Sequence, residues 1–303
     1  MLAFISLSGG REKAPLPEPR AGYAAGVLAG KLLVAGGSYW VGRDKQETAR
    51  VDVFDPQHNA WSRAAPLPRP MCNAASVIYQ GELYVFGGMT GNGALQEALR
   101  LHGDRWEALS EARLPEPRSS SVAAATSAGI FLLGGFGRPN DVWSAVNTLW
   151  FWRPGSSWKE LAPLPSPPRF TPAMAIANAK LYVFGGATPD EKSVRNLDDG
   201  YVYDPAKNAW QPLGPLPVAR RAWWATTIDS RILLFGGYTS DFEAEIYEFD
   251  PTSGAMRVIG KLPHAVADAK FFVIGKHVFG AGGEAGPKIR ARWTVELTID
   301  GAD

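Results

Sequence analysis

The feature that most constrains the fold of this chain is a glycine pair that recurs six times. Each pair ends a short apolar run, as in KLLVAGG and KLYVFGG, and the first glycines are Gly36, Gly87, Gly134, Gly185, Gly236 and Gly282. Successive pairs are separated by 51, 47, 51, 51 and 46 residues. A Leu-Pro step keeps the same period, at Leu16, Leu67, Leu114, Leu164, Leu216 and Leu262. A fixed period of about 50 residues indicates a repeat architecture in which each repeat is one supersecondary unit.

Within each repeat the residues favour β-strands. Aromatic and valine-rich runs are separated by Gly, Pro and Asp-Pro turns, as in VDVFDP and IYEFDP, and four repeats continue to a tryptophan, Trp61, Trp106, Trp158 or Trp210. This order of elements resembles the kelch repeat, which folds as one four-stranded propeller blade. The resemblance covers nearly the whole chain and implies an all-β, six-bladed kelch-type propeller with four antiparallel strands in each blade. The tryptophans are then expected to pack between blades.

The repeat boundaries predict one propeller domain over residues 1–303. Blades one to five are expected at 21–68, 69–115, 116–165, 166–217 and 218–263, and residues 264–303 supply only three strands of blade six. Residues 1–20 precede the first complete repeat, and the segment 3–14 comes before PLPEPR, the element that follows each fourth strand. We therefore expect the N-terminal segment to form the outermost strand of blade six and to close the ring.

Composition narrows the classes of function. The 31 Lys and Arg residues balance 30 Asp and Glu, which disfavours a broad nucleic-acid surface. There is no apolar run of about 18 residues, so no membrane span is predicted. The single cysteine, Cys72, excludes an internal disulfide, and the four histidines lack metal-ligand spacing. We do not interpret the start, MLAFISLSGG, as an intact signal peptide, and the compartment stays open: a trimmed signal would allow a periplasmic or secreted protein.

Propeller geometry brings two sets of residues to one mouth of the ring. Strand two of each blade ends, at its glycine pair, on the face where strand one begins. The candidate substrate-binding residues at this mouth are Arg20, Tyr39, Trp40, Arg118, Arg169, Arg221, Trp223 and Tyr238. Arginines and aromatic rings with few acids suit an anionic ligand with an apolar face. We expect at least two of the four arginines to face the axis without a carboxylate partner; the alternative is a structural role between blades.

One glycine pair is followed directly by an acid. In FGAGGEAGPKIRARW, Glu284 follows the pair and Arg290 comes six residues later. The spacing allows either a functional pair at the mouth or a local ion pair that stiffens the loop. The stretch GGEAGPKIR resembles the Gly-Glu-x-x-Pro-x-x-Arg stretch of the sialic acid mutarotase (N-acetylneuraminate epimerase) family, and residues 22–37 resemble the blade that follows it, in a cyclically permuted order.

This second resemblance implies that Glu284 and Arg290 are the catalytic pair of a mutarotase, an isomerase acting on an acidic sugar such as N-acetylneuraminate. In this hypothesis Glu284 shuttles the proton and Arg290 anchors the sugar carboxylate through a two-pronged hydrogen bond, with no cofactor or metal. The alternative is a non-catalytic kelch module that binds a protein or a glycan. The mouth separates the two hypotheses, because a protein binder should expose a broad patch rather than a narrow polar funnel.

Overall fold

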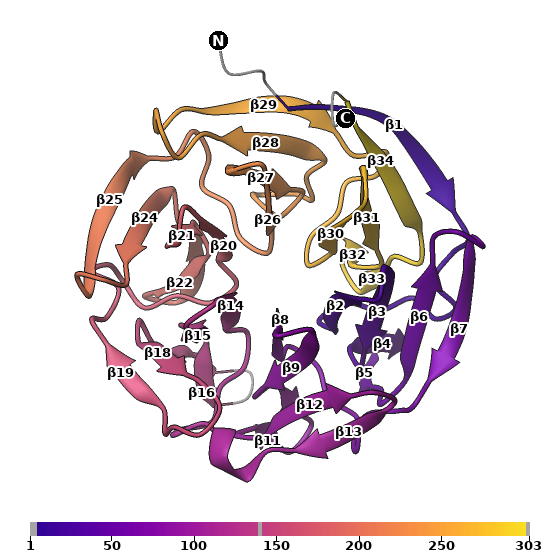
Figure 1. The fold of residues 1–303 in the computed structure, drawn as a ribbon, viewed down its shortest axis with the longest axis horizontal. Helices are drawn as coiled ribbons and strands as arrows, with labels where there is room; N and C mark the ends of the chain where they lie inside the picture. Colours follow the sequence, from indigo (N-terminus) through magenta and orange to yellow (C-terminus); the bar gives the residue numbers. More distant parts are fainter. Residues whose placement is uncertain (1–4, 139–140, 301–303) are drawn as a thin grey trace.

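The chain folds into a closed ring of six β-sheets around a central axis (Figure 1). The structure, a computed structural model, describes residues 5–138 and 141–300. Each sheet has four antiparallel strands and forms one blade, with its first strand nearest the axis. The six-bladed, all-β kelch-type propeller predicted from the repeats is therefore confirmed.

The first three blades follow one another along the chain. Blade one consists of β2 (Ala24–Leu28), β3 (Lys31–Ala35), β6 (Val51–Asp55) and β7 (Ala60–Ala64). Blade two consists of β8 (Ala75–Tyr79), β9 (Glu82–Phe86), β12 (Ala98–His102) and β13 (Arg105–Ala108), and is followed by a 3-10 turn, η1 (Ser110–Ala112). Blade three consists of β14 (Val122–Thr126), β15 (Gly129–Leu133), β18 (Leu149–Trp152) and β19 (Lys159–Leu161).

Blades four and five have the same strand order. Blade four consists of β20 (Ala173–Ala177), β21 (Lys180–Phe184), β24 (Asp199–Asp204) and β25 (Ala209–Pro215). Blade five consists of β26 (Trp224–Ile228), β27 (Arg231–Phe235), β28 (Glu245–Phe249) and β29 (Met256–Lys261). Within the described ranges, no helix has the length and apolar character needed to cross a membrane.

Blade six is completed by the N-terminal segment. It combines β30 (Lys270–Ile274), β31 (His277–Ala281) and β34 (Thr294–Asp300) with β1 (Ser6–Lys13) as the outermost strand. β1 runs antiparallel to β34, from Ser6 opposite Asp300 to Lys13 opposite Thr294, and Figure 1 shows the indigo and yellow strands side by side. The predicted ring closure is confirmed; positions 3 and 4 of the expected strand lie outside the described residues.

Five blades carry a small hairpin between their second and third strands. The hairpins are β4 (Ser38–Val41) with β5 (Asp44–Glu47), β10 (Met89–Thr90) with β11 (Gly93–Ala94), β16 (Phe136–Arg138) with β17 (Asp141–Ala145), β22 (Ala187–Asp190) with β23 (Ser193–Asn196), and β32 (Glu284–Gly286) with β33 (Ile289–Arg290). Each starts directly after a glycine pair, and its first residue bridges the segment that enters strand one. The hairpins therefore surround one end of the axis, which we call the mouth.

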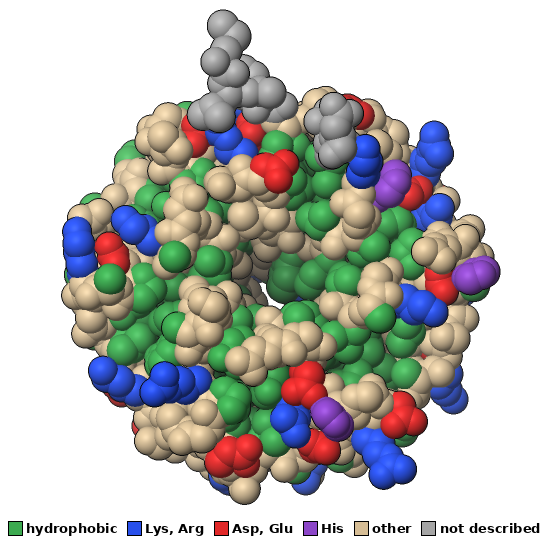
Figure 2. Space-filling view, in the orientation of Figure 1, with side chains coloured by type: hydrophobic (Ala, Val, Ile, Leu, Met, Phe, Trp, Pro, Cys, Tyr) green, Lys and Arg blue, Asp and Glu red, His purple; other side chains and the backbone are tan. Residues whose placement is uncertain are grey.

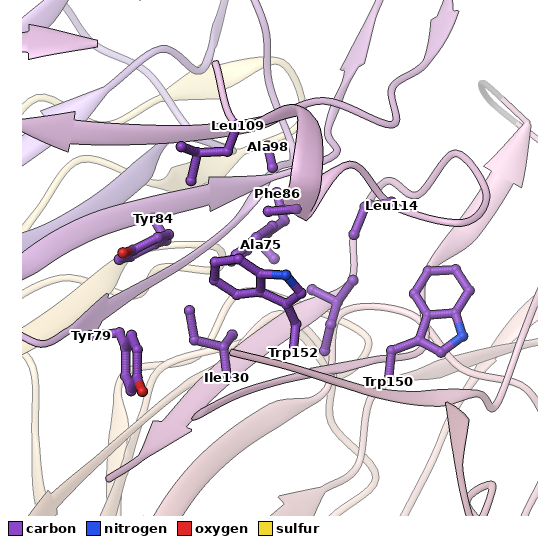
Figure 3. Packing of buried hydrophobic residues seen from close by; sticks show 12 residues of the cluster. Ala75, Tyr79, Tyr84, Phe86, Ala98, Leu109, Leu114, Ile130, Trp150 and Trp152 are labelled. Atoms are coloured by element: carbon purple, nitrogen blue, oxygen red, sulfur yellow. The ribbon is translucent and has the colours of Figure 1, made fainter. Parts of the chain in front are cut away.

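The hydrophobic core lies between blades, because each blade buries both faces against its neighbours. Figure 3 shows one such core, in which Ile130 and Trp152 of blade three pack against Tyr84 and Phe86 of blade two. The strand-four tryptophans extend this packing outward, since each indole Nε1 donates to a carbonyl of the preceding blade. These bonds are 2.8–3.0 Å long and join Trp61 to Ala14, Trp106 to Ala65, Trp158 to Ala112 and Trp210 to Ala162.

The glycine pairs are required where one blade meets the next. In blade three, Gly134 and Gly135 have φ values of 66° and 84°, which side chains rarely adopt. A Cβ atom on Gly134 would lie 2.5 Å from the Arg169 carbonyl oxygen, and one on Gly135 would lie 2.5 Å from the Ser119 carbonyl oxygen. The Gly135 amide also donates to the Arg169 carbonyl at 2.8 Å. The repeated pair in the sequence is thus a contact between neighbouring blades.

Candidate functional site

The inner edge of the mouth is a ring of equivalent residues, one from each blade. They precede strand one and all have φ between 50° and 64°: Gly22, Asn73, Ser120, Thr171, Ala222 and Asp268. The amides of the last five each donate to the carbonyl of the equivalent residue in the preceding blade, at 2.6–3.0 Å. These bonds hold the six blades at a fixed distance from the axis and so set the width of the opening.

A central cavity of ≈ 440 Å³ lies within this ring, in the size range of pockets that hold small ligands or side chains. All six blades contribute to its lining, and its charged residues are Lys45, Arg221, Asp268, Lys270, Glu284 and Arg290. Blades three and four supply an apolar part of the wall, with Phe136, Val142, Phe170 and Met174. Figure 2 shows the axial opening on one face of the ring, where hydrophobic side chains surround it and charged ones lie mostly near the perimeter.

Three of the four predicted arginines are buried in the blades rather than in the cavity lining. Arg20, Arg118 and Arg169 are 0%, 3% and 0% exposed. Arg169 donates to the Gly185 carbonyl at 2.7 Å and to both carboxylate oxygens of Asp199 at 2.9 Å. Arg20 pairs with the buried Asp52, and Arg118 pairs with Glu116 at 2.8 Å.

The expectation that at least two of these arginines would face the axis without a carboxylate partner is therefore wrong. The physical reason is that a guanidinium at this position satisfies both an acid and nearby backbone carbonyls. Arg169 donates to the Gly185 carbonyl, Arg20 to those of Val34 and Arg50, and Arg118 to that of Pro117. The backbone carbonyl of the same arginine accepts a hydrogen bond from the second glycine of the pair in the preceding blade. Arg20, Arg118 and Arg169 therefore have the structural role that was the alternative.

Arg221 differs because its neighbour Arg220 takes the structural position in blade five. Arg220 is 2% exposed and donates to the Gly236 carbonyl at 3.0 Å and to Glu245 at 3.2 Å, as Arg169 does in blade four. Arg221 lines the cavity, donates to Asn196 Oδ1 at 2.6 Å and lies 4.3 Å from the centre of the Tyr238 ring. Burial lowers the pKa of Arg221.

Glu284 and Arg290 both line the cavity and form an ion pair with each other. They are directly opposite on β32 and β33, and Arg290 Nη1 donates to Glu284 Oε1. The same guanidinium donates through Nε to the Ser38 carbonyl of blade one at 3.2 Å. The pair therefore stiffens the hairpin and links blade six to blade one, which is the local ion-pair alternative raised by its spacing.

The predicted aromatic residues divide between the cavity and its surrounding wall. Trp223 lines the cavity, is 3% exposed and donates to the Phe184 carbonyl at 3.1 Å. Trp40 lies beneath Arg290, with 5.9 Å from the ring centre to the guanidinium carbon, and Tyr238 lies beneath Arg221. Tyr39 is opposite Gln46 in the hairpin of blade one. These last three rings are absent from the cavity lining among the described residues.

Three charged cavity residues, Lys45, Asp268 and Lys270, were not among the predicted site residues. Burial, and then the nearby charge of Glu284, raise the pKa of Asp268 to about 6. Burial lowers the pKa of Lys270 to about 8. Lys270 begins strand one of blade six, at the position taken in the other blades by Ala24, Ala75, Val122, Ala173 and Trp224. Superposing the six repeats in the sequence would have shown this lysine at an otherwise uncharged position.

Comparison with known proteins places this fold in a family. The family model described as KLHDC2/KLHL20/DRC7 Kelch-repeats domain matches residues 22–237. Kelch-like protein 25 of Homo sapiens is 25% identical over 276 residues, which cover 88% of this chain and 45% of that protein. Kelch-like protein 38 of Homo sapiens is 26% identical over 230 residues, which cover 73% of this chain and 37% of that protein. The chain therefore matches less than half the length of these relatives.

A viral protein is also similar to this chain. Kelch repeat and BTB domain-containing protein 1 of Vaccinia virus (strain Copenhagen) is 28% identical over 170 residues, covering 55% of this chain and 29% of that protein. The prediction of a sugar isomerase is wrong, because these relatives are Kelch-like proteins and not mutarotases. The Glu-x-x-Pro-x-x-Arg stretch that suggested it forms a structural ion pair. The family match and the six-bladed ring agree: the chain belongs to the KLHDC2/KLHL20/DRC7 Kelch-repeats domain family.

Proposed function

We propose that this chain is a non-catalytic kelch module that binds a protein partner across the mouth. One observation carries the proposal: exposed large hydrophobic side chains gather on the mouth hairpins. Val41, Trp143 and Ile289 are 60%, 56% and 58% exposed, and they lie on β4, β17 and β33. Among the described residues only Val258, on the outer strand β29, is a further large hydrophobic residue exposed to this degree.

The hairpins of neighbouring blades contact each other at three junctions of the ring. β33 contacts β4, β11 contacts β16, and β17 contacts β22, so neighbouring blades join at the mouth. Exposed apolar residues gathered at one end of a protein indicate an interaction surface more often than scattered ones do. Trp143 follows Val142, which lines the cavity, and tryptophan is enriched among interface hot spots. Membership of a family whose relatives are Kelch-like proteins supports the same function.

The proposal is tested with ligands selected on the protein itself. Random peptides displayed on phage are selected against the immobilised chain, and the enriched sequences are synthesised and measured by fluorescence anisotropy. Trp143→Ser should weaken their binding by at least about tenfold, since loss of a hot-spot residue typically costs 2 kcal/mol or more. Ile289→Ser should weaken it by a smaller factor, because its apolar side chain is smaller.

Val258→Ser is the matched control. Val258 is 51% exposed, close to the 56% of Trp143, but lies on the outer edge of blade five. Its substitution should leave the affinity unchanged. Equal binding to the wild type, Trp143→Ser and Ile289→Ser would refute the mouth as the interaction surface, and failure to enrich any peptide with a mouth-dependent affinity would do the same.

A further inference from the structure

Two cations in the central cavity have no carboxylate partner within 4.0 Å among the described residues. Arg221 donates to the amide oxygen of Asn196 at 2.6 Å and lies 4.3 Å from the centre of the Tyr238 ring, while Glu284 acts on it only through its charge at longer range. Lys270 Nζ lies 3.4 Å from Ser76 Oγ and 5.2 Å from the centre of the Trp224 ring. Both side chains line the same cavity. Partly buried cations without an acid are costly unless a ligand compensates them.

The charge of the whole cavity is also positive. Its lining includes four cationic side chains, Lys45, Arg221, Lys270 and Arg290, and two acidic ones, Asp268 and Glu284. Glu284 is already paired with Arg290. When all six groups are ionised, two positive charges remain in excess, and this number matches a dianion better than a single carboxylate.

Hydroxyl groups without partners face the same space. Ser121 is 7% exposed and lines the cavity, and its Oγ has no hydrogen-bond partner among the described residues. Thr171 of blade four also lines the cavity, and its buried Oγ1 likewise lacks a partner. Buried hydroxyls are normally hydrogen-bonded, so two unsatisfied ones in the cavity that also holds the two cations indicate that a ligand completes the site.

We propose that the cavity binds the phosphoryl group of a phosphorylated side chain on the protein partner. A phosphomonoester has a charge of about −1.5 to −2 at neutral pH and three strong acceptor oxygens. The guanidinium of Arg221, the ammonium of Lys270 and the two hydroxyls supply donors for three oxygens, whereas a carboxylate has only two. The inference rests on the proposed protein-binding function and specifies the group that enters the cavity.

The apolar part of the wall fits the rest of such a ligand. Phe136 and Phe170 pack edge to face, with 5.6 Å between their ring centres, and both line the cavity with Val142. These residues belong to blades three and four, across the ring from Lys270 in blade six (Figure 1). A phosphoryl group can therefore bind the cationic side while the group that carries it contacts the apolar side.

The test uses three small probes with the full chain: phenyl phosphate, inorganic phosphate and phenylacetate. In isothermal titration calorimetry at pH 7.5 and low salt, phenyl phosphate should bind at least about tenfold more tightly than phenylacetate. It should also bind more tightly than inorganic phosphate, because it alone reaches the apolar wall. Equal affinity for phenylacetate would overturn the phosphoryl assignment, and equal affinity for inorganic phosphate would point to a free anion instead of a modified side chain.

Substitutions locate the site. Arg221→Gln and Lys270→Met should each weaken the binding of phenyl phosphate by about tenfold or more, since each removes a charged hydrogen-bond donor. Lys192→Gln is the matched control, because Lys192 is an exposed lysine in the hairpin of β22 and β23 outside the cavity lining. It should change the affinity less than twofold. Trp143→Ser should also leave phenyl phosphate binding intact, so failure of the phosphoryl site and failure of the protein-binding surface give different results.

A measurement on the wild type keeps the proposal testable if a variant does not fold. Between pH 7.5 and 5.5 a phosphomonoester loses one negative charge, because its second pKa is near 6. Over the same range Asp268, with a pKa of about 6, is protonated and Lys270, with a pKa of about 8, gains positive charge, so the cavity becomes more positive. The other charged groups that line the cavity are Lys45, Arg221, Glu284 and Arg290. Phenylacetate should therefore bind no more weakly at pH 5.5, and phenyl phosphate should lose its advantage. An advantage that is independent of pH would overturn the proposal.

Discussion

Replacing Arg169 by methionine tests whether the arginines that precede strand one are structural. The guanidinium is fully buried and makes four hydrogen bonds, to Gly185, to both oxygens of Asp199 and to Ser166. Methionine retains most of the apolar stem but removes all four donors. Breaking a buried ion pair by removing one partner costs about 3–5 kcal/mol. The lower end, about 3 kcal/mol, is expected here because the Asp199 side chain is 29% exposed and regains water.

Blade four also contains the matched control. Arg195 and Asp190 form an ion pair of 3.7 Å on the hairpin, with side chains 52% and 50% exposed. Arg195→Met should change the free energy of unfolding by less than about 0.5 kcal/mol, because exposed pairs contribute little. The comparison therefore separates the effect of burial from the effect of losing one positive charge in the same blade.

The assay is urea unfolding monitored by tryptophan fluorescence. Arg169→Met should lower the midpoint with the slope unchanged, and Arg195→Met should overlay the wild type. Because Arg169 is outside the cavity lining, phenyl phosphate affinity should stay within twofold in both variants. If Arg169→Met is as stable as Arg195→Met, or if it loses anion affinity while its stability is unchanged, the structural assignment of these arginines is wrong.

Two further predictions concern ring closure and the buried acid. Deleting residues 1–13 removes β1 and exposes the edge of β34, so the chain should aggregate in light scattering. Deleting residues 1–4 should leave the scattering equal to that of the wild type. Wild-type scattering after the longer deletion would contradict the closure by β1. Folding raises the pKa of Asp268 from 3.8 to about 6. The ionised carboxylate therefore lowers the free energy of unfolding above pH 6, and this destabilisation disappears as the pH falls toward 3.8. Asp268→Asn should therefore raise the stability by about 1–3 kcal/mol at pH 7.5 and by much less at pH 4. Equal gains at both pH values would show that the carboxylate is not the cause.

Several features of the fold were predictable because they depend on local patterns repeated six times. The glycine pair marks the contact between blades, and only glycine fits where Gly134 and Gly135 approach neighbouring carbonyls. The three strands left in the sixth repeat required a fourth from elsewhere, and β1 supplies it. The tryptophans of strand four were expected between blades, and their indole nitrogens bond to the preceding blade. Each of these inferences needed only the period of the repeat and the size of a side chain.

The tertiary structure alone decided which charged residues reach the axis. Arg220 and Arg221 are adjacent in the chain, yet one is buried in the blade and the other lines the cavity, because successive residues of an extended segment point to opposite sides. Glu284 and Arg290 kept their predicted proximity, but they form an ion pair within the hairpin of blade six, and Arg290 also donates to the Ser38 carbonyl of blade one. Lys270, Ser121 and Thr171 belong to no motif. They meet because ring closure brings blades three, four and six to a common cavity, where burial leaves both hydroxyls without partners among the described residues and four cationic side chains outnumber two acids.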